Sequence, residues 1–420
     1  MAWRIYAADL ICILAIQLLT QAFGITNDTT ISQAVVPDFS VQGKIYSEKL
    51  NPTRSDLLDV DAVTNSLYLS PLTFRSNYDE MLEKFKIYIY PRKQQDFGSP
   101  EWCGDQRFRD LDKHGASFYE NLISSDFVTD DPEKAHLFFL PFSLDASGTK
   151  STASVSRFLR RYIDDLKSQY PFWSRTLGAD HFYFSCEGIL TDSSRSVVEL
   201  KKNAIQISCY PLALSVEGAK ARFFPHKDIS MPPVESVTDV HQTPKLQQSD
   251  GESRTIFAYH VGAPAGLDSV LQLWKNDPDF VLDPLLPEPN LYFQRLSSSR
   301  FCLIFFGDGG NSSILVDAVK FGCIPVIIAQ GPLFDVPFQD ILNWQEFVII
   351  LNMRQVSNLK QTLQNIPESQ LQKMKTLAIQ ASEHLRWHST PQPYDAFYSL
   401  MYQLWLRRHT IRYARRHISS

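Results

Sequence analysis

Residues 300–329 read RFCLIFFGDGGNSSILVDAVKFGCIPVIIA, and they give the clearest indication of the fold. Apart from Arg300, the runs at 300–306 and 323–329 are continuously apolar, which is the pattern of strands buried on both faces of a parallel sheet. Between them lie a glycine-rich turn at 307–310 and an apolar run with helical spacing at 313–321. The stretch therefore predicts a β-α-β unit, in which a crossover helix joins two parallel strands.

The same rhythm of strands and helices extends in both directions from this unit. Short apolar segments rich in β-forming residues recur before it, at 85–90, 136–142, 181–186, 204–209 and 228–230. Further strands are expected at 255–259 and 347–351, and helical spacing is found at 155–170, 267–275 and through most of 356–416. Residues 232–253 have the Pro, Ser, Gln and Asp composition of a linker. We therefore predict an α/β protein of two Rossmann-like domains, at 81–240 and 250–365, followed by C-terminal helices at 366–420.

Length and composition agree with a folded protein of this size. The chain has 420 residues, more than one hydrophobic core usually serves, and 44% of them are hydrophobic. Its net charge of -5 offers no basic footprint, so nucleic acid is not expected as a partner. Five arginines crowd into the C-terminal tail between Arg407 and Arg416. A solvated helix face is the simplest interpretation of this tail, and a contact with lipid or another polyanion is the alternative.

The N-terminus has the features of a secretory targeting segment. Arg4 precedes an apolar run at 10–19, and small residues follow at 22–24, so residues 1–24 are expected to be a signal peptide or an uncleaved signal anchor. Residues 25–80 show little apolar periodicity and are expected to form a stem. Asn27, in Asn27-Asp28-Thr29, is a candidate glycosylation site within that stem.

Six cysteines are present, and the five that follow the targeting segment would face an oxidising lumen. Cys302 and Cys323 lie on neighbouring strand-like segments, as do Cys186 and Cys209. These are the preferred disulfide pairs, although buried free thiols are the alternative for either pair. The partner of Cys103 is left open.

Several motifs, in a specific order and spacing, resemble the exostosin-like family-47 glycosyltransferases, and most closely their plant branch. The C-terminal half contributes FCL at 301–303, Gly307-Asp308, Ser312, Asp317-Ala318, GCIPVII at 322–328 and PFQDILNW at 337–344. The N-terminal half contributes KIYIY at 86–90, WCGD at 102–105, DPEKAHLFFLPF at 131–142, GADHF at 178–182 and LKKNA at 200–204.

The resemblance covers roughly residues 85–351 and implies a GT-B architecture, in which two Rossmann-like domains face a cleft. It also implies inverting transfer of a sugar from a nucleotide-sugar, with a UDP-linked donor expected, to a cell-wall or matrix polysaccharide or a glycoprotein. No tightly bound metal or cofactor is implied, and no zinc or Walker motif is found in the sequence. The expected location is the Golgi membrane, as a single-pass type II protein with a lumenal catalytic body, and a cleaved, secreted form is the alternative.

The candidate donor site is the glycine-rich turn with the helix that follows it, since ligands of open α/β sheets bind where strands end and helix N-termini begin. The expected nucleotide-sugar-binding residues are Gly307, Asp308, Gly309, Asn311, Ser312, Ser313, Asp317 and His260. Asp317 would accept hydrogen bonds from the ribose, and His260 would reach the donor phosphates. The alternatives are a tight structural turn, a carboxylate that complements the helix dipole, and an ordinary loop histidine.

Inverting transfer also needs a group that deprotonates the acceptor hydroxyl. Glu187 is the first candidate because it directly follows the strand predicted at 181–186, and His181 is the second. The alternatives are a residue of a surface turn for Glu187 and a hydrogen-bonded structural histidine for His181.

Three positions depart from the family pattern, which usually has basic residues near the donor diphosphate. They are occupied here by Phe306, Ile314 and Asp268. Loss of charged contacts weakens phosphate binding, so the alternative function is a catalytically weakened family member that binds glycans or assembles with an active transferase. Arg295, Arg300 and Lys320 are the basic residues that could compensate.

Overall fold

The computed structural model describes residues 66–91, 113–142, 152–185, 195–209, 223–234, 254–262, 272, 274–306, 314–329 and 336–418. Residues Asp59–Ser420 form one compact unit, and Met1–Leu58 form another that lies outside the described residues. The predicted targeting segment and Asn27 therefore lie outside the description. Within the described part of the chain, no helix has both the length and the apolar character needed to cross a membrane.

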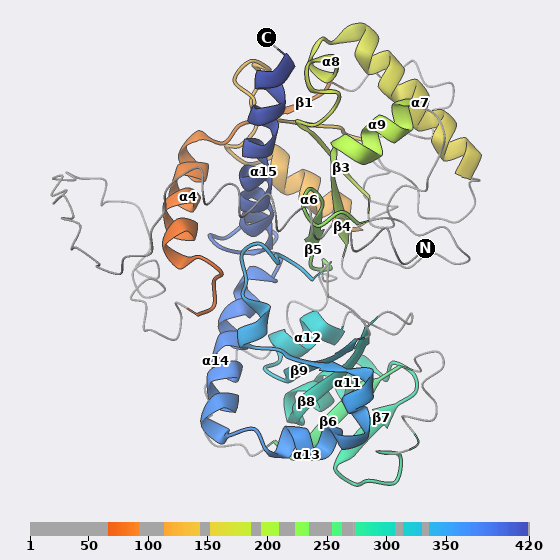
Figure 1. Cartoon of the computed structure of the whole chain (residues 1–420), viewed down its shortest axis with the longest axis vertical. Coiled ribbons are helices and arrows are strands. Elements are labelled where there is room, and N and C mark those ends of the chain that lie inside the picture. Colours follow the sequence, from red (N-terminus) through yellow and green to blue (C-terminus); the bar gives the residue numbers. More distant parts are fainter. Residues whose placement is uncertain are drawn as a thin grey trace, which may run out of the picture. The chain divides into compact units, whose positions relative to one another are not determined.

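The first sheet has five strands that follow one another in chain order (Figure 1). They are β1 (Ile87–Ile89), β2 (Leu137–Phe139), β3 (His181–Phe184), β4 (Ile205–Cys209) and β5 (Ile229–Met231). All neighbours are parallel, with Phe138 opposite His181 and Ser208 opposite Ser230. Strands β1 to β4 fall within segments predicted from the sequence, and β5 extends one residue beyond its predicted segment at 228–230. The continuously apolar β2 has the pattern expected of a strand covered on both faces.

Helices cover both faces of the first sheet. One face packs against α7 (Thr152–Gln169), α8 (Phe172–Thr176) and α9 (Arg195–Asn203), whose apolar residues form one buried cluster with Phe138 and Tyr183. The other face packs against α4 (Pro71–Lys84) and α6 (Lys113–Ile123). For example, the ring of Phe118 in α6 lies 5.9 Å from that of Phe139 in β2. The sheet is thus the middle layer of three.

The second sheet also has five parallel strands, in the order β10-β9-β8-β6-β7. They are β6 (Ile256–Val261), β7 (Phe280–Asp283), β8 (Ser299–Phe306), β9 (Ile324–Ala329) and β10 (Ile349–Asn352). The sequence predicted all of them except β7, which has four residues and only three apolar side chains. Two parallel sheets with covering helices confirm the predicted α/β class and the two Rossmann-like halves.

The helices of the second half divide between the faces of this sheet. The apolar residues of α11 (Pro289–Ser298), α12 (Ile314–Lys320) and most of α14 (Glu368–His384) belong to the cluster that contains Tyr259 and Cys302. Trp274 and the residues of α13 (Leu359–Gln364) belong to the cluster that contains Ala258 and Leu303. Two short 3-10 helices, η1 (Trp344–Glu346) and η2 (Met353–Asn358), flank β10.

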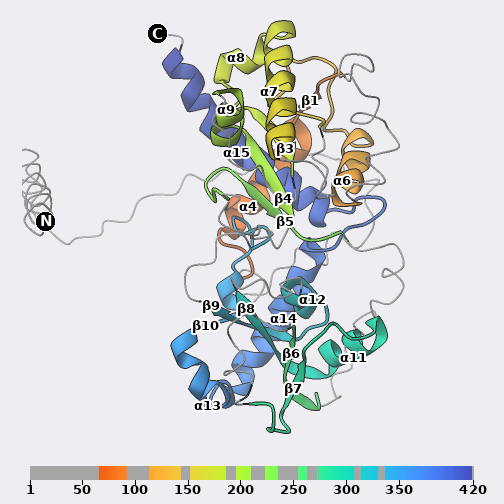
Figure 2. The ribbon, with the colours of Figure 1, turned by 90° about the vertical axis from the view of Figure 1, so that its right-hand side faces the viewer.

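The chain ends in the long helix α15 (Ala396–Ile418), which lies along the first sheet next to β5 (Figures 1 and 2). Arg407 of this helix donates to the backbone oxygens of Lys227 and Asp228 at 2.7 Å each and to Asp340 Oδ2 at 2.9 Å. Arg407 and Arg408 are 7% and 6% exposed, so the prediction of a solvated basic tail is wrong for these two residues. They hold the helix to the folded body.

The folded body also begins earlier than predicted, inside the expected stem at 25–80. Helix α4 spans Pro71–Lys84, and it buries Phe74, Tyr78 and Met81. The ring of Phe74 lies 4.9 Å from that of Tyr402 in α15, and the backbone N–H of Tyr394 donates to Tyr78 Oη at 3.0 Å. These partners are more than 300 residues away in the sequence, which explains why local periodicity did not reveal the helix.

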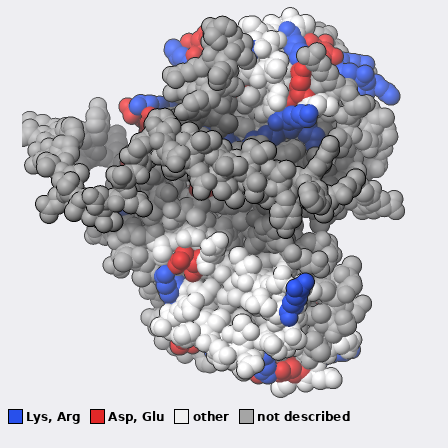
Figure 3. Space-filling view, viewed as in Figure 1, with Lys and Arg blue, Asp and Glu red and all other residues white. Residues whose placement is uncertain are grey.

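The surface of the described residues carries both signs of charge. On the face shown in Figure 3, Lys and Arg side chains lie among Asp and Glu side chains. Several described pairs are salt bridges, such as Lys373 with Glu346 at 2.6 Å. This distribution agrees with the net charge of -5.

Candidate functional site

The strand order singles out one place in the second sheet. After β6 the chain forms β7 on one side of it and then β8 on the other side. The connections from neighbouring parallel strands leave in opposite directions at such a switch point, and ligands of open α/β sheets bind there, outside the carboxyl ends of the strands. The first sheet keeps its described strands in chain order and has no such reversal. The candidate site is therefore the carboxyl edge between β6 and β8.

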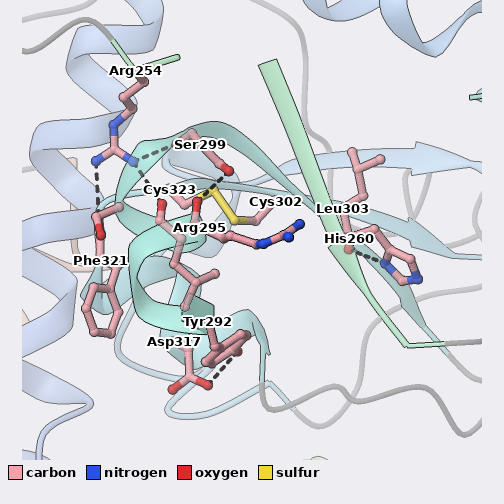
Figure 4. Close-up of a disulfide and its surroundings, with 12 residues drawn as sticks. Arg254, His260, Tyr292, Arg295, Ser299, Cys302, Leu303, Asp317, Phe321 and Cys323 are labelled. Carbon is pink, nitrogen blue, oxygen red and sulfur yellow. Dashed lines mark hydrogen bonds between the residues drawn. A yellow bond between two sulfur atoms is a disulfide. The ribbon is translucent and has the colours of Figure 1, made fainter. Parts of the chain in front are cut away.

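His260 lies at this switch point. It is the penultimate residue of β6, and its Nδ1 lies 3.0 Å from the backbone oxygen of Leu303 in β8 (Figure 4). The ring is 4% exposed and meets the ring of Phe305 edge to face at 5.0 Å. Its Nε2 has no hydrogen-bond partner among the described residues. Burial lowers the pKa of His260, and hydrogen bonds to backbone oxygens partly oppose this shift, so the imidazole is neutral at neutral pH.

The chain turns sharply just after His260. Gly262 has a φ of 112°, a conformation that L side chains rarely adopt, and its N–H donates to the backbone oxygen of Asp283 at 2.8 Å. The glycine therefore lets the chain leave the sheet directly at the end of β6. The sequence prediction placed His260 in the loop beyond the strand, whereas the structure places it inside β6.

Asp317 lies in the first turn of α12, half-buried, on the other face of the sheet from His260. The Tyr292 hydroxyl of α11 donates to Asp317 Oδ2 at 2.9 Å. Burial, with the nearby Asp317 charge, raises the pKa of Tyr292 well above its ordinary value, so the phenol keeps its proton and remains a donor. Figure 4 shows this pair pointing away from His260. The two predicted donor residues thus occupy opposite faces of the sheet.

The opposite, amino edge of the second sheet is held together by covalent and charged contacts. Cys302 and Cys323, one of the two preferred pairs, form a disulfide with their Cα atoms 5.8 Å apart. Arg254 donates to the backbone oxygens of Ser299 at 2.6 Å, Phe321 at 3.0 Å and Leu296 at 3.1 Å (Figure 4). Arg254 was not predicted from the sequence, because its three carbonyl partners are 42 to 67 residues away and its sequence neighbours do not indicate them.

Cys209 is disulfide-bonded as well. Its predicted partner, Cys186, lies outside the described residues, as does Cys103.

The glycine-rich turn and the first base candidate lie outside the described residues. These are Gly307, Asp308, Gly309, Asn311, Ser312, Ser313 and Glu187. Asp268 also lies there, and only the backbone of Phe306, at the end of β8, is described. Their roles stay predictions.

Both ring nitrogens of His181 are engaged by neighbouring side chains. His181 is fully buried at the start of β3, where its Nε2 lies 2.8 Å from the Tyr90 hydroxyl and its Nδ1 lies 2.8 Å from Asp180 Oδ1. Asp180 is in turn bound by Thr176 and by Arg175, whose Nη2 lies 3.3 Å from Asp180 Oδ2. These contacts agree with the alternative given above, a hydrogen-bonded structural histidine, while the catalytic roles of His181 and of Glu187, the first candidate, stay predictions.

The structure explains one of the three departures from the family pattern, the apolar residue Ile314. Ile314 is 1% exposed and packs in the core, so an apolar residue suits its position. Of the basic residues expected to compensate, Arg295 is paired with Asp283 at 3.0 Å, Arg300 is paired with Glu368, and Lys320 is 3% exposed. Among the described residues, no cluster of three or more His, Cys, Asp or Glu side chains is arranged to hold a metal.

The chain is similar to several known proteins. A probable glycosyltransferase of Arabidopsis thaliana is 30% identical over 81% of this chain, and the chain spans 65% of that relative's length. A probable β-1,4-xylosyltransferase of the same plant is 28% identical, over 67% of this chain and 71% of the relative. A crystal structure of the GtfA/B complex matches with a TM-score of 0.29 and 13% identity, over 62% of this chain and 60% of that one.

The model of one protein family matches most of the chain. This family is the Exostosin GT47 domain, and the match covers residues 81–366, which include all ten strands described above. The chain belongs to the exostosin GT47 family of glycosyltransferases.

Proposed function

We propose that this chain transfers a sugar from a UDP-linked nucleotide-sugar to a polysaccharide of the cell wall or matrix, or to a glycoprotein, with inversion at the anomeric carbon. The family assignment and the xylosyltransferase relative support the reaction class and the kind of acceptor. The observation that carries the donor site is the switch point between β6 and β8, where a buried histidine presents an unpartnered nitrogen.

In this proposal the second sheet binds the nucleotide-sugar at its carboxyl edge. The turn at 307–313 would bring backbone N–H groups close to the diphosphate, since glycines let the backbone approach a ligand. The acceptor hydroxyl would attack the anomeric carbon, the nucleoside diphosphate would leave with the bonding electrons, and a base would take the hydroxyl proton. Glu187, beyond the carboxyl end of β3, is the preferred base. No tightly bound metal or cofactor is proposed.

The proposed location is the Golgi membrane, with a lumenal catalytic body. The apolar segment at 10–19 and the disulfide between Cys302 and Cys323 support a secretory-pathway location, because disulfides persist in oxidising compartments. A tagged full-length chain should therefore be found with Golgi membranes after cell fractionation.

A second candidate function is an inactive partner of an active transferase. The observation in its favour is that Arg295 and Arg300, which were expected to replace the missing diphosphate contacts, are both engaged in ion pairs. Each lost hydrogen bond to a charged group costs about 1.5–3 kcal/mol, so donor binding would suffer if nothing else replaced it.

Donor hydrolysis and transfer by the purified full chain, with a panel of UDP-sugars and glycan acceptors, distinguish the two functions. The proposed function predicts turnover with at least one UDP-sugar and loss of that turnover in Glu187→Gln. A folded protein with neither turnover nor nucleotide affinity would support the partner role instead.

A further inference from the structure

The two ring nitrogens of His260 have different hydrogen-bonding roles. A backbone carbonyl oxygen only accepts hydrogen bonds, so the 3.0 Å contact with Leu303 requires the proton to be on Nδ1. In a neutral imidazole the other nitrogen, Nε2, then has a lone pair and no proton. The strand β8 therefore selects one tautomer of His260.

The free nitrogen also lies in surroundings that do not satisfy it. His260 is 4% exposed, its ring and that of Phe305 meet edge to face, and no described residue donates to Nε2. Buried polar atoms in native proteins nearly always have a partner, and the exceptions call for a reason. At the carboxyl edge of a switch point, a bound ligand is the most direct reason.

We propose that His260 Nε2 accepts a hydrogen bond from a hydroxyl group of the bound nucleotide-sugar, on its ribose or on its transferable sugar. This inference rests on the proposed function and identifies what His260 recognises. It replaces the expectation that His260 reaches the donor phosphates. Phosphate oxygens offer no proton to a nitrogen that carries only a lone pair, whereas ribose and sugar hydroxyls do.

Calorimetry on the full chain tests the inference with His260→Asn. The asparagine amide nitrogen can keep the hydrogen bond to Leu303 O, but no atom occupies the place of Nε2. The matched control is His384→Asn, because His384 is equally buried and both of its nitrogens are engaged, by Tyr68 Oη at 2.9 Å and by Ser399 Oγ at 3.0 Å. Thermal unfolding shows whether each variant is folded at the temperature of the titration.

The ligands are UDP, 2′-deoxy-UDP, 3′-deoxy-UDP and UDP-xylose. Loss of one hydrogen bond should weaken binding about three- to tenfold in His260→Asn and leave it unchanged in His384→Asn. If the hydroxyl belongs to the ribose, the loss appears with UDP and is absent with one of the deoxy analogues. If it belongs to the sugar, the loss appears with UDP-xylose and not with UDP.

Equal affinities of wild type and His260→Asn for all four ligands would overturn the inference and leave the proposed function intact. Absence of binding by folded wild-type protein would instead overturn the proposed function. Histidine ¹⁵N NMR of the ligand-free chain tests the tautomer independently. A proton on His260 Nε2 would contradict the assigned tautomer, irrespective of the binding results.

Discussion

Arg407→Met tests whether one buried guanidinium holds α15 to the folded body. Arg407 donates to the backbone oxygens of Lys227, Asp228 and Gln403 and to Asp340 Oδ2, at 2.7, 2.7, 3.1 and 2.9 Å. Methionine preserves much of the apolar stem but removes every donor. The oxygens of Lys227 and Asp228 then lose their charged partner in a buried place, which costs about 1–3 kcal/mol for each group.

The expected total is about 2–6 kcal/mol of unfolding free energy. Asp340 adds little, because its side chain is 38% exposed and water can replace the guanidinium. With an unfolding entropy of about 2 cal/mol/K per residue over a unit of this length, the melting temperature should fall by roughly 3–8 °C. Urea and thermal unfolding followed by circular dichroism measure both quantities.

Arg300→Met is the matched control. Arg300 also forms an ion pair, with Glu368, but its side chain is 39% exposed and that of Glu368 is 63% exposed. Exposed pairs contribute about 0–1 kcal/mol, so this variant should unfold almost as the wild type does. Arg407→Lys should recover only part of the loss, because an ammonium group lacks the planar fork that reaches several oxygens. If Arg407→Met destabilised the chain no more than Arg300→Met, the reasoning would be refuted.

Three further predictions concern other buried groups. The double variant Cys302→Ala, Cys323→Ala removes a cross-link between residues 21 positions apart and should lower the stability by about 3 kcal/mol in urea unfolding. Reduced wild type should lose at least as much, because reduction also breaks the disulfide of Cys209, and an unchanged urea midpoint in the double variant would contradict the role of the disulfide. Burial lowers the pKa of His384 from 6.5 to about 4, so between these pH values the imidazole is protonated in the unfolded chain and neutral in the folded chain. Stability is then complete above pH 6.5 and falls by up to about 3 kcal/mol as the pH drops toward 4, a slope that should be smaller in His384→Asn than in wild type when unfolding is measured at several pH values. Asp317→Ala should weaken UDP binding in calorimetry if Asp317 contacts the ribose, and equal affinities would remove Asp317 from the site.

Much of the architecture could be predicted from local pattern. Residues 301–306 and 324–329 are apolar throughout, and β2 has the same signature, because these strands are covered on both faces. Helix α4 and strand β7 escaped prediction for a physical reason. These two elements are stabilised by partners distant in the sequence, such as Tyr394 and Tyr402 for α4. A short or weakly periodic segment does not indicate such contacts by its own sequence.

The site could be predicted only in part. Sequence placed His260 near the right strand and Asp317 in the right helix, but strand order is invisible in a linear pattern. The switch point depends on β8 pairing beside β6 while β7 takes the other side, and β7 was not foreseen. Whether a ring nitrogen has a hydrogen-bond partner also depends on residues that are distant in the sequence. Both ring nitrogens of His181 have described partners, whereas Nε2 of His260 has none.

The two ends of the second sheet differ in a way that separates stability from binding. At the amino edge, the disulfide joins the strand β8 to the segment before β9, and Arg254 ties the ends of α11 and α12 to the start of β8. At the carboxyl edge, the described groups are a turn at Gly262 with positive φ and a histidine whose Nε2 is unpartnered. A rigid amino edge fixes the positions of β6 and β8 relative to each other, and the Leu303 contact passes that order on to the His260 ring. Preorganised groups on rigid strands bind a ligand with little further loss of conformational entropy. The contacts at the amino edge therefore support ligand binding at the carboxyl edge.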